Sequence, residues 1–473
     1  MESPVSAVLH NGVIFLAEQM GKKRRLKRWK APPIQCAGDV LAYAREKKIH
    51  RLWICPDSDL STFVREQREN FLQAPLVSEL HVHEQDNTSM YEDEVKLLPT
   101  CITAFYATRG KMDLSWGQIV IPEYDGRWVT LCYLDDPALL CITLYYLEHV
   151  MHMAVRSAPA TTGRAWMQRE GRKRPTWYRE ADLSALPDVG SPPLYWKRPL
   201  TAEEAGKKYV YVYDKRSQHV DACTDTVLGV GTPRHVMRPE YTRRCAGLYH
   251  IKVRGEGVWN GTRLPPALPD PMEEQWVWGP LVAVAYDAGY DVEVLEGYVW
   301  DQSHRVLAGW AKQVLTARKA LEMEVEEYPY EAARKAALKE LKMIGVAGIG
   351  LLNAQPDDWR GAEVWYRPDW YRTIVATART RLMYGVLRRE QLGYFPVMVV
   401  ADSVAYLSDN PDPETAVPEL LKKGFALKYR LPLASHLAVF EPECSVAQAN
   451  RLLNEAARLQ QEDLDVKETT EDD

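Results

Sequence analysis

The stretch Tyr211-Val-Tyr-Asp214-Lys-Arg-Ser217-Gln-His219 and the later stretch Val397-Met-Val-Val-Ala-Asp402-Ser403-Val-Ala-Tyr406 decide the fold of this chain. In each, a run of β-branched and aromatic residues predicts a buried strand that delivers an aspartate at or near its end. The two aspartates lie 188 positions apart (402 − 214). Carboxylates on adjacent strands can hold two divalent metal ions about 3.5–4 Å apart. The sequence therefore predicts a metal site made by Asp214 and Asp402.

Length and composition predict a globular chain with two or three domains. The chain has 473 residues, of which 46% are apolar and 26% charged, so one ordinary core is too small for it and wholesale disorder is not expected. Its formal net charge of −6 argues against a protein that coats nucleic acid non-specifically, but it leaves room for a local basic groove.

Neither membrane insertion nor export is expected from the sequence. Apolar runs stay shorter than the roughly 18 residues that a membrane-spanning helix needs, and the N-terminus lacks a signal-peptide pattern. None of the eight cysteines has C-x-x-C spacing. We therefore expect a cytoplasmic protein with reduced cysteines, rather than a zinc site or a disulfide framework.

The first part of the chain alternates short apolar runs with helix-like stretches, which is typical of an α/β domain. Residues 51–55 and 128–133 are predicted to be buried strands, and a helix is expected from Asp136-Pro137 to Met153. Residues 156–200 are rich in Pro, Arg and Trp, which indicates a connector or a loop that faces nucleic acid. A β-rich segment follows from 209 to about 278, with a short helix and a strand in 280–300.

Two helices are predicted at 303–327 and 330–344, with Pro329 between them. The second helix carries a row of lysines, Lys335, Lys339 and Lys342. Such a row is usually a solvated face; the functional alternative is contact with a nucleotide triphosphate. Glycines follow at 345, 348 and 350, where a backbone can approach a ligand or a base pair closely.

The order of these elements resembles the polymerase core of family B DNA polymerases. Motif A of that family is a strand-end Asp followed by x-x-Ser, which Asp214 and Ser217 match. Motif B runs from a helix Lys to a Gly, as in 342–350, and motif C ends in Asp-Ser, as in 402–403. The segment 374–379 is similar to a helix between motifs B and C, and Lys428-Tyr429 is similar to the family's Lys-x-Tyr.

The resemblance, which covers about 210–435, implies an α+β fold with a right-hand-like palm and two-helix fingers. An N-terminal α/β domain, either exonuclease-like or unrelated, would precede them. The layout is similar to the compact, protein-primed branch of phages, plasmids and linear replicons. The expected divisions are an N-terminal domain 1–155, an Arg/Pro-rich connector 156–205, palm segments 206–279 and 368–440, fingers 280–367, and a minimal thumb with an acidic tail 441–473.

The resemblance also implies roles for individual residues. Asp214 and Asp402 would be the catalytic metal ligands for two Mg²⁺ or Mn²⁺ ions. The nucleotide would be bound by Ser217, His219, Arg318, Lys339, Lys342 and Gly350. The primer–template backbone would be held by Arg379, Lys428 and Tyr429. The alternatives are two satisfied strand-end aspartates, a helix salt-bridge network with Glu322 and Glu340, and a solvated basic face.

Three departures from the family pattern bear on activity. His219 replaces the motif A Tyr, which excludes ribonucleotides, and Val400 replaces the first motif C Asp. Both changes leave the metal pair intact. Val346 and Ile349 replace the Asn and Tyr of motif B, which removes polar and aromatic surface beside the nascent base pair. Sugar selection and fidelity are therefore where this chain is expected to differ.

Other motifs are weaker. The basic run 21–30 is either a phosphate-binding segment or a solvated loop, and the cluster Arg172, Lys173 and Arg174 would clamp a single nucleic-acid strand or be solvated. The histidine pairs at 81/83 and 149/152 have metal-like spacing but are more often structural. The N-terminal domain lacks the Asp-x-Glu of a proofreading exonuclease, so we expect no nuclease activity from it.

The favoured prediction is a template-directed DNA polymerase whose partners are DNA primer–template and nucleoside triphosphates, with a terminal protein or a primase as candidate protein partners. One alternative is a catalytically inactive, polymerase-like scaffold in replication or end maintenance. The other is a non-templated nucleotidyltransferase, which would use the same metals but ignore template sequence.

Overall fold

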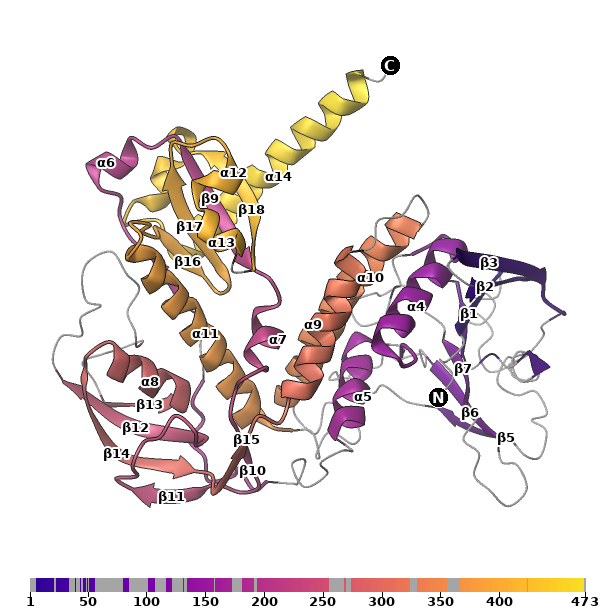
Figure 1. Ribbon diagram of the computed structural model, residues 1–473, viewed down its shortest axis with the longest axis horizontal. Coiled ribbons are helices and arrows are strands. Elements are labelled where there is room, and N and C mark those ends of the chain that lie inside the picture. Colours follow the sequence, from indigo (N-terminus) through magenta and orange to yellow (C-terminus); the bar gives the residue numbers. More distant parts are fainter. Residues whose placement is uncertain are drawn as a thin grey trace, which may run out of the picture. The chain divides into compact units, whose positions relative to one another are not determined.

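The computed structural model describes residues 6–20, 23–33, 51–55, 80–84, 101–106, 116–120, 134–156, 158–171, 181–190, 194–254, 274–323, 330–354, 366–422 and 424–471, together with 39, 43, 46, 47, 49, 131 and 268. The chain divides into two compact units (Figure 1). Unit 1 consists of 1–178 and 307–368, and unit 2 of 179–306 and 369–473. Among the described residues, no helix is long and apolar enough to cross a bilayer.

A seven-stranded sheet forms the core of unit 1, in the order β3-β2-β1-β4-β7-β6-β5. The strands are β1 Ser6–His10, β2 Val13–Met20, β3 Lys23–Lys30, β4 Arg51–Ile54, β5 Leu80–Glu84, β6 Cys101–Tyr106 and β7 Trp116–Val120. β4 pairs with β1 and β7 in parallel, and the remaining pairs are antiparallel. The predicted strand at 51–55 is confirmed by β4, whereas that at 128–133 lies almost entirely outside the described residues.

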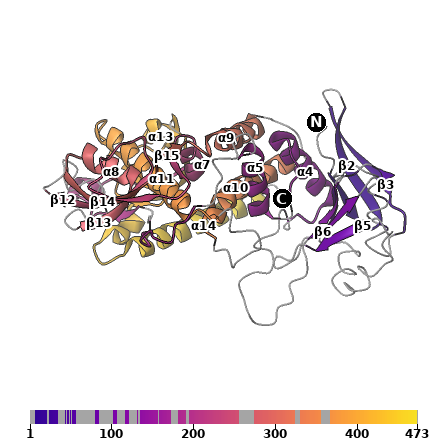
Figure 2. The same ribbon diagram turned by 90° about the horizontal axis from the view of Figure 1, so that it is seen from below.

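Four helices of unit 1 are described, and they confirm most of the predicted helical pattern. α4 (Pro137–Met151) begins where Asp136 caps it, accepting a hydrogen bond of 2.8 Å from the Ala138 amide. α9 (Ala308–Met323) and α10 (Tyr330–Gly350) are the predicted pair, followed by the 3-10 turn η2 (Leu351–Asn353). α4, α5 and α10 lie on the same side of the sheet (Figure 2).

The stretch expected to be a connector is not a loop throughout. Residues 159–171 form helix α5 (Pro159–Gly171), and the side chains of Trp166 and Met167 are buried. Its proline content suggested a loop, but the proline stands at the first position of the helix, where the missing N–H is tolerated. The small residues that follow allow close packing. Arg172, Lys173 and Arg174 lie outside the described residues.

Unit 2 is built around an antiparallel five-stranded sheet in the order β18-β9-β17-β16-β8. Its strands are β8 Tyr195–Lys197, β9 Tyr209–Lys215, β16 Met398–Val400, β17 Ser403–Ser408 and β18 Phe425–Pro432. In β9, which lies between β18 and β17, Val210 to Tyr213 are at most 1% exposed. Tyr211 and Tyr213 enter one hydrophobic cluster, while Val210 and Val212 enter another. Burial on both faces explains why this strand reads as a continuous apolar run.

The remaining elements of unit 2 surround this sheet. A second sheet has the order β11-β14-β12-β13 and packs against α8, and β10 pairs with β15. Their bounds are β10 Leu228–Val230, β11 Arg234–Met237, β12 Gly247–Arg254, β13 Glu274–Trp278, α8 Gly279–Asp287, β14 Asp291–Val299 and β15 Gln302–His304. The segment assigned to the fingers from the sequence begins at residue 280, where α8 packs against this second sheet and β14 pairs with β12.

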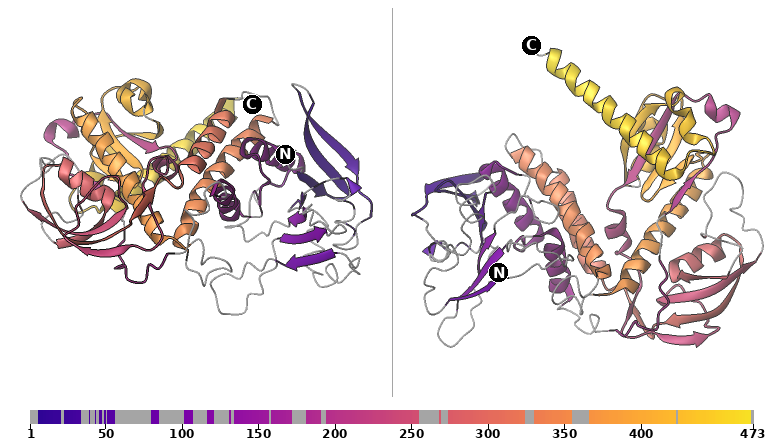
Figure 3. Two further views of the ribbon diagram at one scale, coloured as in Figure 1. Left: turned by 60° about the horizontal axis from the view of Figure 1, so that its bottom comes forward. Right: turned by 180° about the vertical axis from the view of Figure 1, so that it is seen from behind.

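The helices of unit 2 complete it. They are α6 Ala202–Ala205, α7 Gln218–Ala222, α11 Pro368–Glu390, α12 Pro413–Ala416, α13 Pro418–Lys422, η4 Ala434–Phe440 and α14 Val446–Glu471. The first half of α14 buries Ala449 and Leu453 on the five-stranded sheet, and the helix then runs on past the sheet (Figure 3).

Candidate active site

The two predicted aspartates lie at the same end of the five-stranded sheet. Asp214 is near the end of β9 and is paired across the ladder with Ser403, the first residue of β17. Asp402 sits in the two-residue turn between β16 and β17, since Val400 pairs with Ser403. The Lys215 amide donates a hydrogen bond of 2.8 Å to the Asp402 carbonyl oxygen. Strand pairing thus brings together two carboxylates that are far apart in the sequence.

Strained backbone flanks both aspartates. Ala401 has φ of 55° and Ser217 has φ of 51°, values in the left-handed region that side-chain-bearing residues seldom occupy. The Ala401 amide is held by a hydrogen bond of 2.9 Å to the Leu194 carbonyl. Such strain persists only where the surrounding structure imposes it, and it is concentrated at functional sites.

The electrostatics of the pair are unbalanced. The Ser403 hydroxyl donates a hydrogen bond of 2.8 Å to Asp214 Oδ1, which fixes that carboxylate. Burial, followed by the negative charge of Asp214, raises the pKa of Asp402 to about 6, while the charge of Lys428 opposes this shift. Burial and a neighbouring negative charge each make the ionised form of a carboxyl group less favourable, and a nearby positive charge would offset both effects.

Lys428 reaches this end of the sheet because of a β-bulge. The pairing of β18 with β9 shifts register between Leu427 and Tyr429, so Lys428 has no partner in the ladder. Bulges commonly re-aim a side chain beside a site. Lys428 is exposed, and its charge acts on Asp402. Tyr429, by contrast, buries its hydroxyl, which has no hydrogen-bond partner among the described residues. Its predicted contact with the primer–template backbone stays a prediction.

The turn after β9 carries two further predicted residues. Ser217 stands at the N-terminus of α7, where its side chain makes no capping hydrogen bond. His219 follows in the first turn of α7, and burial lowers its pKa below the usual value, so the imidazole is neutral at pH 7. It is not fully buried, and a neutral ring can present an apolar face to a ligand.

Helix α7 is fastened to α11. Gln218 Nε2 donates a hydrogen bond of 3.0 Å to the Ala378 carbonyl, and the Arg381 guanidinium lies 2.9 Å from Asp221 and 2.5 Å from Asp225. These contacts fix the turn that holds Ser217. Arg379 is only 5% exposed, and burial lowers its pKa to about 10, so the predicted contact between Arg379 and the DNA backbone is not supported.

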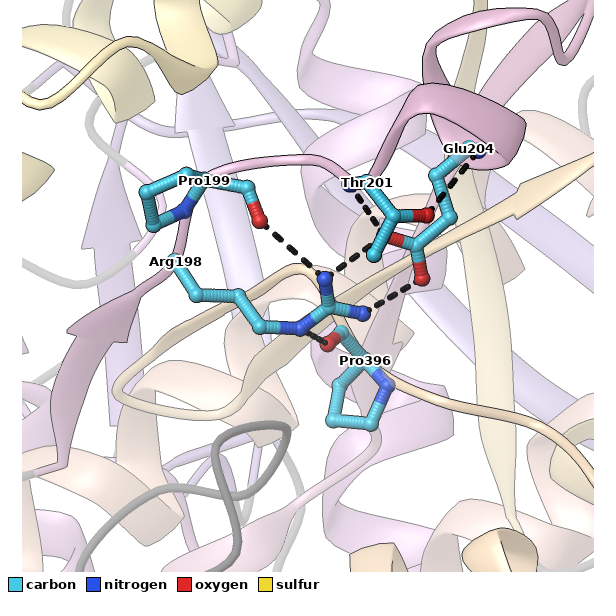
Figure 4. A network of polar contacts seen from close by, with 5 residues as sticks. All are labelled: Arg198, Pro199, Thr201, Glu204 and Pro396. Carbon is cyan, nitrogen blue, oxygen red and sulfur yellow. Dashed lines mark hydrogen bonds and ion pairs between the residues drawn. The ribbon is translucent and has the colours of Figure 1, made fainter.

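An ion pair lies beside the edge strand β8 of the five-stranded sheet (Figure 4). Arg198 donates two hydrogen bonds of 2.7 Å to Glu204 and one of 3.1 Å to the Pro396 carbonyl. Glu204 also accepts from the Thr201 amide at 2.9 Å and closes the capping box of α6. Because Pro396 precedes β16, the paired guanidinium holds the start of the hairpin that carries Asp402.

The remaining predicted nucleotide-binding residues belong to unit 1. Lys339, Lys342 and Gly350 are exposed on α10. Arg318 forms an i,i+4 ion pair of 2.8 Å with Glu322. Glu340 is 3% exposed, and burial raises its pKa to about 7; among the described residues it has no ion-pair partner of the kind that the salt-bridge alternative requires.

The glycines of α10 have a packing role. A Cβ on Gly163 of α5 would lie 2.4 Å from the Ile344 carbonyl oxygen and 2.9 Å from Gly348 Cα. Two glycines therefore let the α5 and α10 backbones touch. The prediction that this run leaves room for a ligand is wrong for Gly348, whereas a Cβ on Gly350 would meet nothing within 4 Å.

The donor set fits divalent metal ions with substrate present. Within the described parts of the chain, no three His, Cys, Asp or Glu side chains are grouped to hold a metal by themselves. Mg²⁺, however, is usually held by one or two carboxylates together with substrate phosphates and water. Asp214 and Asp402 supply two such carboxylates at one end of the sheet.

Several residues that build the site were not predicted from the sequence. Ser403 was matched to motif C, but its hydrogen bond to Asp214 was not predicted. Arg198, Glu204 and Arg381 gave no signal, because their contacts join segments far apart in the chain.

No protein-family model matches the sequence, and neither does any curated protein. Among solved structures, the chain is similar to Phi29 DNA polymerase complexed with primer-template DNA, with a TM-score of 0.45 and 10% identity over 87% of this chain and 81% of that one. The same polymerase with single-stranded DNA gives 0.44 and 9% over 90% and 84%.

A third similar structure is the family B DNA polymerase from the hyperthermophilic archaeon Pyrobaculum calidifontis, with a TM-score of 0.36 and 12% identity over 88% of this chain and 54% of that one. Because these TM-scores are all below 0.5, we base the function on the chain's own residues.

Proposed function

We propose that this protein catalyses template-directed nucleotidyl transfer, with Asp214 and Asp402 as ligands for two Mg²⁺ or Mn²⁺ ions. The observation that carries the proposal is the pair of carboxylates at one end of the five-stranded sheet, where the pKa of Asp402 is raised. When bound, the ions would favour the ionised primer hydroxyl and neutralise the leaving pyrophosphate.

In the reaction, the primer 3′-hydroxyl loses its proton and its oxygen forms a bond to the α-phosphorus of the nucleotide. The bond from that phosphorus to the bridging oxygen breaks, and pyrophosphate leaves. The protein's own contribution is positioning. Ser403 fixes Asp214 through its 2.8 Å hydrogen bond, the strained turns orient both aspartates, and the neutral His219 would lie beside the incoming sugar.

The exposed lysines of α10, Lys339 and Lys342, would contact the triphosphate as point charges. Arg318 would help if its ion pair with Glu322 opens, which costs little on a surface. Lys428 would face the nucleic-acid backbone near the aspartates. The valine and isoleucine at 346 and 349 favour one rival, a polymerase-like scaffold that binds nucleic acid without catalysis.

Primer extension with Mg²⁺ and with Mn²⁺ tests this proposal. The wild type is compared with Asp214→Asn and Asp402→Asn, and with Asp301→Asn as a control, because Asp301 is exposed and pairs only with Arg234 among the described residues. Loss of a metal ligand should lower the rate by more than about 100-fold, and the control should match the wild type. Incorporation that ignores template sequence would favour a non-templated transferase; no incorporation by a wild type that still binds DNA would favour the scaffold.

A further inference from the structure

Strand β3 is an unusual edge strand. It lies at the outer edge of the unit 1 sheet and pairs with β2. Its sequence, KRRLKRWK over Lys23–Lys30, holds six cations in eight residues. The basic run expected to be either a phosphate-binding segment or a solvated loop is therefore an ordered strand with one edge unpaired in the described sheet.

The cations of β3 are largely uncompensated. Arg25, Lys27, Arg28 and Lys30 are exposed. Lys27 pairs with Glu18 at 2.6 Å, and the Arg28 guanidinium lies 5.3 Å from the centre of the Phe15 ring. Arg25 and Lys30 have no ion-pair partner among the described residues. On a chain with a net charge of −6, this edge is a local concentration of positive charge.

The strand is anchored, so the charges are held in place. The Trp29 indole N–H donates a hydrogen bond to the Tyr43 hydroxyl, and Tyr43 is 8% exposed. Ile14, which pairs with Trp29 across the ladder, is fully buried. The row of cations is therefore part of the folded sheet.

We propose that the outer edge of β3 is a binding site for the phosphate backbone of nucleic acid. Residues two apart on a strand lie on the same side, about 6.8 Å from each other. A nucleic-acid strand likewise carries its negative charges at regular intervals, one phosphate at every nucleotide. Arg28 and Lys30 on one side, and Arg25 and Lys27 on the other, therefore match a regular polyanion. The proposed binding of nucleic acid at β3 does not depend on the proposed catalytic activity.

Two rival roles for the β3 cations predict different behaviour. Charges on an edge strand prevent edge-to-edge aggregation, but charge of either sign does so, and spacing is irrelevant. An acidic peptide would offer carboxylates only where its sequence places them. A nucleic acid carries a charge at every phosphate and so meets all four cations without a special sequence.

The test measures DNA binding by the full chain, with a chelator present and no nucleotide. Fluorescence anisotropy of labelled DNA gives the affinity at a series of salt concentrations. Arg25→Glu/Lys30→Glu is compared with Lys422→Glu/Arg458→Glu. The control pair is exposed, carries ion pairs on other elements, and changes the net charge equally. Reversed charge on β3 still protects the edge, so both variants should stay monomeric by light scattering.

The β3 variant should lose at least about tenfold in affinity at low salt, and its slope of log K against log salt should fall by about 2, one unit per lost phosphate contact. The control should keep the wild-type slope. If the charge reversal disturbs folding, the neutral pair Arg25→Gln/Lys30→Gln replaces it. This pair should show the same change in slope. Three results would overturn the proposal. They are equal loss of affinity in both charge-reversed pairs, no DNA binding by the wild type, and tight binding of an acidic peptide that leaves DNA binding unchanged. Failed primer extension would leave this result intact.

Discussion

The β16–β17 turn of unit 2 and the glycine-rich end of α10 in unit 1 both interrupt the regular pattern of their elements. In the turn, Ala401 has a left-handed backbone and Asp402 has a raised pKa, so the irregularity leaves an energetic cost unrelieved. In α10, Gly348 packs directly against the backbone of Gly163. Close packing of the two helices therefore accounts for the glycine.

The difference separates two meanings of an unusual residue. Where the fold satisfies it, as at Gly348, a structural role is sufficient. Where the fold leaves it strained or uncompensated, as at Asp402, a ligand that binds there is the better explanation. Substitutions at the two regions should therefore move stability in opposite directions.

The largest effect is expected at the helix crossing. Gly163→Ala should destabilise unit 1 by about 2–3 kcal/mol, because the new Cβ meets the Ile344 carbonyl, which is backbone and cannot rotate away. Chemical denaturation followed by far-UV circular dichroism, with hydrogen exchange of the α10 amides, measures this. Gly350→Ala is the matched control: its Cβ has open space, so stability should stay constant or rise by about 0.5–1 kcal/mol. A Gly163→Ala protein as stable as the wild type would contradict the close crossing.

The next effect has the opposite sign. Asp402→Asn should stabilise the metal-free protein at pH 7–8 by about 1–2 kcal/mol, a value discounted for partial solvent exposure. A carboxyl whose folded pKa is about 6, above its unfolded value, stabilises the fold only while protonated. Wild-type stability from this group therefore falls as the pH rises from about 4 to about 6, and the gain in the variant should vanish below pH 4.

Thermal unfolding in a chelator across this pH range measures that gain. Asp409→Asn is the control, because its hydrogen bond and ion pair with Lys207 lower the Asp409 pKa; removing that carboxylate should not stabilise the protein at any pH. Added Mg²⁺ should raise the wild-type melting temperature and leave Asp402→Asn unchanged. A variant less stable than the wild type at pH 8 in chelator would show that the turn has no uncompensated charge.

Local sequence patterns predicted what local physics determines. The apolar runs before Asp214 and Asp402 identified the strands β9 and β16. The two aspartates lie at the same end of the sheet because β17, which follows Asp402, pairs antiparallel with β9. Proline at the start of α4 and the apolar spacing of α9 and α10 identified helices.

Features that depend on distant partners could not be predicted. Gly348 is explained by Gly163, and the orientation of Lys428 depends on a register shift against β9. Arg379 looked like a surface cation, but its helix α11 is buried around its circumference by residues such as Trp370, Ile374 and Leu382. No apolar stripe marked an inner face on that helix, so the sequence did not indicate the guanidinium's burial.

The smallest effect tests the strain itself. Ala401→Gly should stabilise unit 2 by about 0.5–1 kcal/mol, because glycine adopts a φ of 55° without steric cost. Ala405→Gly, in the regular strand β17 and fully buried, should instead destabilise by about 1 kcal/mol. Denaturant titration of both variants gives the two signs. If the strain orients Asp402, Ala401→Gly should also bind Mn²⁺ more weakly in the presence of primer–template and nucleotide, since a freer turn must be ordered on binding. Equal destabilisation by both substitutions would mean that the turn holds no strain, and the contrast with α10 would then rest on charge alone.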